Sequence, residues 1–271
     1  MWRIASIRAW APRTLAPRSP VLPAALVVLL TASVLGILAG FLPGGRATRG
    51  AGVSTAPTSP AAYSGRGLPL PPPGQTSGGN YVFTPADLRA AYDLAPLYTL
   101  GLTGQGQTVV VIVAFGSPTL QADVAAFCAQ YGLPPAQIAI DAPLGTVPFD
   151  AKNAEMLLWA RETEADVEMI HAIAPGAAIA VLTSPVDETQ GTAGLPQFLQ
   201  LEQYAVARHL GNIISQSWGA SEATLDDPTG RLMVAQFDQF YAQAESDDGT
   251  TFLAASGDHG ATDWADAAMH A

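Results

Sequence analysis

The sequence is poor in cysteine and in charged residues. Its 271 residues include one cysteine, Cys128, which excludes an internal disulfide. Cys128 falls on the apolar stripe of a predicted helix with Leu120, Val124 and Phe127, so we expect a small core residue there and not a nucleophile. Charged residues make up 13% and hydrophobic residues 49%, which is enough apolar sequence for one large domain or two small ones.

Basic residues are scarce outside the N-terminal segment. Residues 1–50 contain six arginines and no acidic residue, whereas residues 51–271 contain six basic and 23 acidic residues, a net charge of −17. An acidic body does not attract a polyanion, so we expect no nucleic-acid partner. The excess of carboxylates suits a protein that stays soluble where these groups are partly protonated, which hints at acidic surroundings.

One apolar run is long enough to cross a membrane. The uncharged segment 21–42 follows four arginines and would extend about 33 Å as a helix. We interpret 1–20 as a basic cytoplasmic segment and 21–42 as a transmembrane signal anchor, which places the body outside the cytoplasm at the cell membrane. The alternative is a cleaved signal peptide and a secreted protein.

Residues 43–80 lack periodic apolar positions. This stretch is dominated by Gly, Pro, Ser, Thr and Ala and includes three consecutive prolines at 71–73. Such a composition predicts a disordered, semi-extended linker. The folded domain is therefore expected to span 81–271.

Strands and helices alternate along this domain. The β-branched run from Thr108 to Phe115 predicts a buried parallel strand, and shorter runs predict strands near 138–140, 178–183, 212–218 and 251–255. Helical segments separate these runs, which predicts an α/β fold with a parallel sheet and helices on both faces. The glycines within 103–106 precede the first strand, whereas those of a dinucleotide-binding fingerprint follow one, so a phosphate loop is not indicated.

Three segments follow strands or lie beside them in this arrangement. They are Ser217-Trp218-Gly219, the stretch 256–260, and the neighbourhood of an acidic helix at 159–176. Binding and catalytic sites of parallel α/β sheets lie beyond the carboxyl ends of the strands. A site is therefore expected where these segments meet.

The acidic helix carries two carboxylate pairs. Glu162 and Asp166 are four residues apart, which places them on one helical face about 5–6 Å apart at Cβ. Two like charges so close resist ionising together, and one should hold its proton to a higher pH. Glu164 and Glu168 have the same spacing, so the alternative is that at least one pair lies on a solvated face.

Five segments in order resemble the catalytic domain of the sedolisins, the serine-carboxyl peptidases. They read FTPADLRAAYDL, TGQGQTVVVIV, the E-x-x-x-D helix running into HAIAPGA, SQSWG and ASGDHGATD, and they lie between Tyr81 and Asp263. The resemblance covers about two-thirds of the chain. It implies a subtilisin-like fold and hydrolysis of peptide bonds in peptide or protein substrates at acidic pH.

The resemblance also implies residue roles. Glu162 matches the general base and Asp166 the second carboxylate that orients it. Asp258 matches the acid of the oxyanion hole, which must be protonated to donate a hydrogen bond. Ser217, Trp218 and Gly219 match the substrate-binding strand.

The departures from this pattern predict an inactive fragment. The family's nucleophile lies in a Gly-Thr-Ser motif downstream, and the sequence contains no Gly-Thr-Ser. The family's calcium site belongs to the same C-terminal part, so no metal or other cofactor is expected in this chain. His259 stands where serine is usual, and Val113 where an acidic residue is frequent. We therefore expect the N-terminal part of a truncated catalytic domain.

The sequence leaves two alternatives to a truncated peptidase. One is a non-catalytic extracellular binding or scaffolding module, which would require a partial sheet, with an open edge and an uncovered apolar face, to fold alone. The other is a subtilisin with a histidine base. No histidine lies in a His-Gly-Thr-His context, which argues against it; the four are His171, His209, His259 and His270. His171 is expected to be packed or partnered within the acidic helix.

Overall fold

A computed structural model describes residues 76–77, 80–81, 83–188 and 191–257. The predicted segments 1–20 and 21–42, most of the linker 43–80, and Asp258 lie outside these residues, so the expectations for them stay predictions. Within the described ranges, no helix combines the length and apolar character that a membrane crossing needs.

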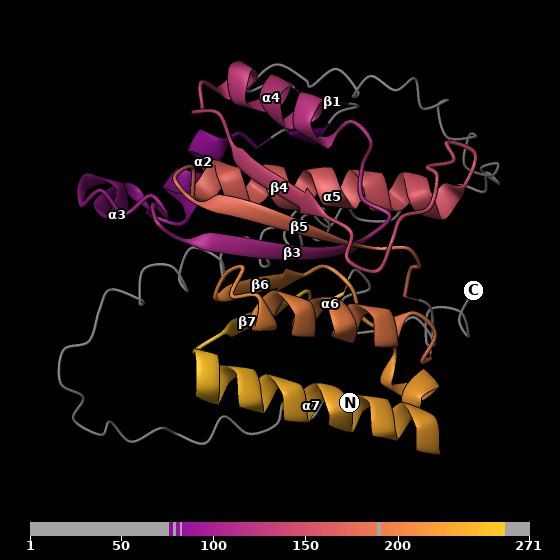
Figure 1. Cartoon of the computed structure of the whole chain (residues 1–271). Helices are drawn as coiled ribbons and strands as arrows, with labels where there is room; N and C mark the ends of the chain where they lie inside the picture. Colours follow the sequence, from indigo (N-terminus) through magenta and orange to yellow (C-terminus); the bar gives the residue numbers. More distant parts are fainter. Residues whose placement is uncertain (1–75, 78–79, 82, 189–190, 258–271) are drawn as a thin grey trace, which may run out of the picture.

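Five parallel strands form the central sheet (Figure 1), in the order β4-β5-β3-β6-β7. Their bounds are Gln137–Asp141 for β4, Ala178–Ser184 for β5, Thr108–Ala114 for β3, Ile213–Gln216 for β6 and Thr251–Ala254 for β7. All five lie within a few residues of the predicted runs. The α/β class and the parallel sheet are thereby confirmed.

Strand β3 is central because its sequence suits burial on both faces. Its residues from Val109 to Ala114 are all buried, and five of these six are Val or Ile. In the ladder, Val109 lies opposite Ile179 of β5 on one side and Ile213 of β6 on the other. The two edge strands are less buried, since most of β4 is exposed.

Helices cover both faces of the sheet. Helix α5 (Ala154–Ile173) packs on β3, and α4 (Leu120–Tyr131) packs on α5. Helix α6 (Leu195–Ala207) packs on β3 and β5 from the other side, and α7 (Pro228–Asp248) packs on α6 (Figure 1). The expectation of an uncovered apolar face is therefore wrong for the described sheet, because α6 and α7 shield the side opposite α5.

A short helix attaches the start of the domain to the end of α5. Helix α2 (Pro85–Ala91) begins at Thr84, whose hydroxyl accepts from the backbone N–H of Asp87 while the Asp87 carboxylate accepts from Thr84 N. Arg89 then donates two hydrogen bonds to the Ala172 carbonyl, at 3.0 and 2.7 Å. Helix α3 (Ala95–Thr99) follows, and two short strands precede α2: Thr76–Ser77 (β1) and Asn80–Tyr81 (β2) pair antiparallel at the end of the predicted linker.

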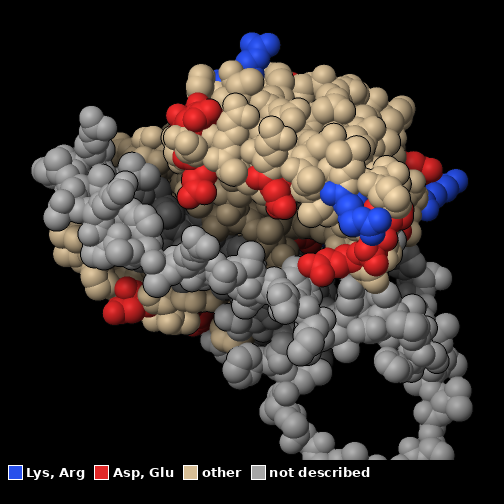
Figure 2. All heavy atoms as spheres, turned by 90° about the horizontal axis from the view of Figure 1, so that it is seen from below, with Lys and Arg blue, Asp and Glu red and all other residues tan. Residues whose placement is uncertain are grey.

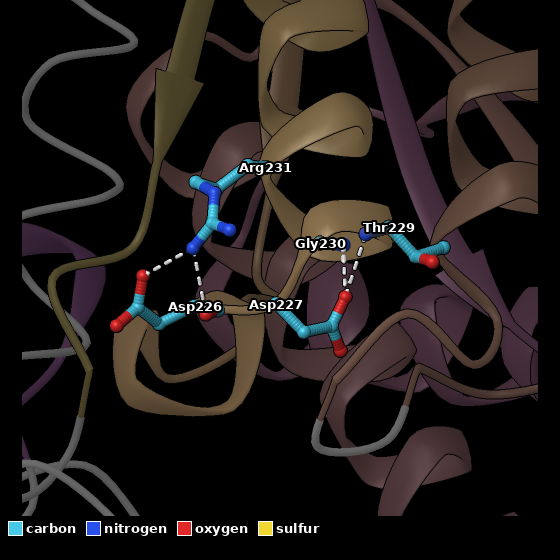
Figure 3. Close-up of polar contacts among 5 residues, drawn as sticks. All are labelled: Asp226, Asp227, Thr229, Gly230 and Arg231. Carbon is cyan, nitrogen blue, oxygen red and sulfur yellow. Dashed lines mark hydrogen bonds and ion pairs between the residues drawn. The ribbon is translucent and has the colours of Figure 1, made fainter.

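Helix α7 begins at Pro228, directly after a capping aspartate. Asp227 Oδ1 accepts from the backbone N–H groups of Thr229 and Gly230, at 2.6 and 2.9 Å (Figure 3). Arg231 Nη1 donates to Asp226 Oδ1 and to its carbonyl oxygen, both at 2.7 Å. The cap and the proline at the first position define this start. The preceding turn is the 3₁₀ helix η1 (Glu222–Leu225).

Candidate active site at the carboxyl end of the sheet

Helix α5 carries the Glu162/Asp166 pair. The helix begins at Asn153, whose side-chain oxygen accepts from the backbone N–H groups of Glu155 and Met156 at 2.9 and 3.2 Å. Three turns later Asp166 is only 4% exposed, while Glu162 is partly buried. Asp166 is thus shielded from bulk water, and Glu162 is partly so.

Asp166 is bonded to the segment that follows strand β6. Ser217 Oγ donates to Asp166 Oδ1 at 2.7 Å, across 51 residues of sequence. The other oxygen, Asp166 Oδ2, is buried without a hydrogen-bond partner among the described residues. The structure thus joins two of the predicted segments, the acidic helix and Ser217-Trp218-Gly219.

Burial, and then the nearby Glu162 charge, raise the pKa of Asp166 to about 8, while the hydrogen bond from Ser217 lowers it. Asp166 therefore holds its proton at neutral and acidic pH. Burial is the larger cause, and the like charge that the four-residue spacing brings close adds to it.

Trp218 faces an aromatic cluster and not open solvent. Its ring centroid lies 4.8 Å from that of Phe198 on α6 and 5.9 Å from that of Phe237 on α7. Its indole Nε1 is buried without a hydrogen-bond partner in the described part of the chain. Gly219 is exposed, and a Cβ added there would have no atom within 4 Å. Gly219 is therefore the residue of this segment whose backbone is accessible to a ligand.

Glu188 lies beside this backbone and is not among the residues predicted from the sequence. Burial first, and then the charges of Asp187 and Glu155, raise the pKa of Glu188 to about 7, while hydrogen bonds from the backbone at Glu188 and Gly219 lower it. Its Oε2 is buried without a partner among the described residues. Its place in the loop after β5, at the carboxyl edge of the sheet, was the available signal.

The second acidic pair is also partly buried, so the interpretation of a solvated face is wrong. Glu164 Oε1 accepts from Ser117 Oγ at 2.6 Å and from Thr119 Oγ1 at 3.4 Å, because the loop after β3 packs over this side of α5. Burial, followed by the charges of Glu164 and Asp123, raises the pKa of Glu168 to about 8. This pair lies toward α4, where the Asp123 charge acts on both groups.

Two other predicted packing residues are buried as expected. Cys128 is 4% exposed and lies in the main core. His171 is fully buried, and its Nε2 donates to the Pro134 carbonyl at 2.7 Å. Burial, rather than this hydrogen bond, dominates its titration and lowers the pKa of His171.

A groove on the described surface lies apart from the acidic pair. No group of three or more His, Cys, Asp or Glu side chains in the described ranges is arranged to hold a metal ion. A groove of about 450 Å³ runs between α6 and α7, with Leu199 and Phe240 among its apolar residues and five glutamines along it. None of the predicted site residues lines this groove. Figure 2 shows the molecule from the α7 side, where the described surface is largely uncharged with scattered acidic side chains.

The fold and the site define a parallel α/β protein with two coupled carboxyls at the carboxyl end of its sheet. No sequence profile of a known protein family matches the chain. Kumamolisin from Bacillus sp. (strain MN-32) is 31% identical over 186 residues, which are 67% of this chain and 30% of that protein. The chain thus spans about a third of the length of this relative. Over the matched part it is related to the sedolisin family.

A solved structure gives a weaker likeness. Pseudomonas sedolisin, a serine-carboxyl proteinase complexed with two molecules of pseudo-iodotyrostatin, is 20% identical, with a TM-score of 0.42 over 58% of this chain and 41% of that one. Of the predicted site residues, the structure brings Asp166 to Ser217, with Glu162 close enough to act on the Asp166 pKa. Asp258 is not placed.

Proposed function

We propose that Glu162 and Asp166 are the carboxyl part of a serine-carboxyl peptidase site that acts on peptide or protein substrates at acidic pH. One observation carries this proposal: Asp166 is buried one helical turn from Glu162 and is bonded to Ser217 at the carboxyl end of β6. A solvated acidic face would have neither the burial nor the bond. The relationship to Kumamolisin supports the same reaction class.

The two carboxyls would have different roles. Asp166 keeps its proton to about pH 8, so it acts as the supporting acid. Glu162 would be the general base that takes the proton from a serine hydroxyl, which requires it to be ionised at the working pH. Asp258 would donate a hydrogen bond to the developing oxyanion, which requires it to be protonated. The protonated Asp258 favours acid, and the need for an ionised Glu162 sets the lower limit of the working pH.

Ser217 is not the nucleophile in this scheme. Its hydroxyl donates to Asp166, a carboxyl that retains its proton and is therefore a poor base. The sequence also contains no Gly-Thr-Ser. We therefore expect the 271-residue chain to bind peptide at this site without cleaving it. The signal anchor at 21–42 and a place outside the cytoplasm remain part of the proposal.

Peptide binding and cleavage by the full chain test the proposal. The chain is mixed with unstructured octapeptides of random sequence between pH 3 and pH 6, with tryptophan fluorescence reporting binding and mass spectrometry reporting cleavage. We expect binding that Glu162→Gln weakens and no cleavage. Glu245→Gln is the control, because Glu245 is an exposed carboxylate on α7 outside the candidate site.

Each other outcome changes a defined part of the proposal. Cleavage abolished by Glu162→Gln would support the carboxyl pair and disprove the expected inactivity. Binding indifferent to Glu162 would favour a non-catalytic binding module. Absence of binding at every pH would reject a peptide site.

A further inference from the structure

Strand β6 is tied at its carboxyl end to a buried carboxyl on each face of the sheet. Gln216 is its last residue and Ser217 follows, so their side chains point to opposite faces. Ser217 Oγ donates to Asp166 of α5, and Gln216 Nε2 donates to Glu202 Oε1 of α6. Two consecutive residues thus connect two acids from opposite layers.

Glu202 is a costly residue at this position. It is fully buried between α6 and the sheet, although an apolar residue would satisfy the packing there. Tyr241 of α7 donates to its Oε1 at 3.2 Å, and Gln216 Nε2 also donates to the Tyr241 hydroxyl at 3.0 Å. Burial raises the pKa of Glu202 to about 8, against hydrogen bonds from Gln216 and Tyr241 that lower it, so the group is neutral in acid. The Glu202 carboxyl, which is neutral in acid, thus accepts hydrogen bonds from Gln216 and Tyr241 and connects α6 with β6 and α7.

The backbone ladder ends where this network begins. Gln216 is the last residue of β6 that pairs with β3 and β7, opposite Ile112 and Ala254. Ser217 lies beyond the ladder, so its position depends on how Gln216 is held.

We propose that Glu202 is a positioning residue for the candidate active site: through Gln216 it fixes the end of β6 and holds Ser217 Oγ on Asp166. The role of Glu202 in a peptidase site rests on the proposed function. Its geometry can be tested without peptide.

The pKa of Asp166 is the readout. The full chain is labelled with ¹³Cγ-aspartate and titrated from pH 5 to pH 10 by NMR, and the Asp166 signal is assigned by its loss in Asp166→Asn. Ser217→Ala is the benchmark, because it removes a hydrogen bond that favours the charged form. We expect it to raise the pKa of Asp166 by about one unit.

Glu202→Leu removes one of the two acceptors of Gln216 Nε2 and leaves the Tyr241 hydroxyl, and we expect it to raise the pKa of Asp166, as Ser217→Ala does. Combining it with Ser217→Ala should give no further rise. Glu202→Gln keeps a carbonyl acceptor and should leave the Asp166 pKa near the wild-type value. Leu201→Ala removes a neighbouring fully buried side chain of the same helix. This control should lower the melting temperature and leave the Asp166 pKa unchanged.

An unchanged Asp166 pKa in a folded Glu202→Leu chain would overturn the inference and leave Glu202 a packing residue only. If that variant does not fold, Gln216→Met, which keeps the volume and removes the amide, gives the same decision. The exchanged pair Glu202→Gln with Gln216→Glu restores an acid beside an amide and should return the Asp166 pKa toward wild type. Because no peptide takes part, this result is independent of the binding test for the proposed function.

Discussion

Burial of Asp166 costs stability and at the same time raises the pKa of its carboxyl. Burying a carboxyl with one hydrogen bond disfavours its charged form, and the nearby Glu162 adds to the effect. The result is an acid that stays protonated where most aspartates are ionised. The same burial that costs stability therefore supplies a proton-holding group beside Glu162.

The coupling of the pair can be measured directly. We expect Glu162→Gln to lower the pKa of Asp166 by about one unit, because it removes the like charge that opposes ionisation. NMR titration of ¹³Cγ-labelled aspartate measures the change. Glu155→Gln removes an exposed charge from the first turn of the same helix and should have a smaller effect. Equal shifts in the two variants would mean that Glu162 has no special proximity to Asp166.

At the scale of the elements, hydrophobic patterning predicted every strand of the five-stranded sheet. The run Thr108–Ala114 is so rich in β-branched residues that its burial follows from composition. The strand order β4-β5-β3-β6-β7 was not predicted, because order depends on long-range pairing and not on local pattern. The hairpin of β1 and β2 was missed because its strands have two residues each, too few for a periodic signal.

The site was predicted in part for the same reason. The four-residue spacing of Glu162 and Asp166 is local and visible in the sequence, whereas the bond from Ser217 joins residues 51 positions apart. Glu202 has a local signal in the sequence, although it is not among the predicted site residues. It lies on the buried stripe of α6, four residues after Phe198 and three before Ala205, where a charged residue is unexpected.

Close packing of β3 against the turn before β6 predicts a stability effect. A Cβ at Gly211 would lie 2.4 Å from the Thr108 carbonyl oxygen, so Gly211→Ala must push the backbones of these segments apart. We expect a loss of about 1–3 kcal/mol in the free energy of unfolding, measured by urea denaturation. Gly219→Ala is the control, because a Cβ there meets no atom within 4 Å, and its effect should stay within about 0.5 kcal/mol. Similar losses in the two variants would contradict the close approach at Gly211.

At the scale of the whole molecule, buried carboxyls make stability depend on pH. Asp166 and Glu202 both have a folded pKa of about 8, well above the value of about 4 expected for exposed carboxyls. Between these values the folded chain holds protons that the unfolded chain has lost. Their contribution to stability is therefore fully present below about pH 4 and decreases as the pH rises toward 8.

We expect the melting temperature of the wild-type chain to fall between pH 5 and pH 8. The slope in free energy is about 1.4 kcal/mol per pH unit for each group over the part of the window where its protonation differs. The double variant Asp166→Asn/Glu202→Gln should show a shallower fall, measured by calorimetry across this range. A wild-type curve that rises toward pH 8, or an equal slope in the double variant, would contradict the prediction.

His171 has the opposite effect on stability, because its lowered pKa destabilises the folded chain at low pH. The loop that supplies Pro134 encloses the imidazole on α5, and its pKa lies below that of an exposed histidine. As the medium becomes more acidic than about pH 6.5, the unfolded chain accepts a proton that the folded chain resists, so the free energy of unfolding declines. His171 therefore opposes in acid the stabilising effect of Asp166 and Glu202, and the contact between α5 and the Pro134 loop is the part of the fold that low pH weakens.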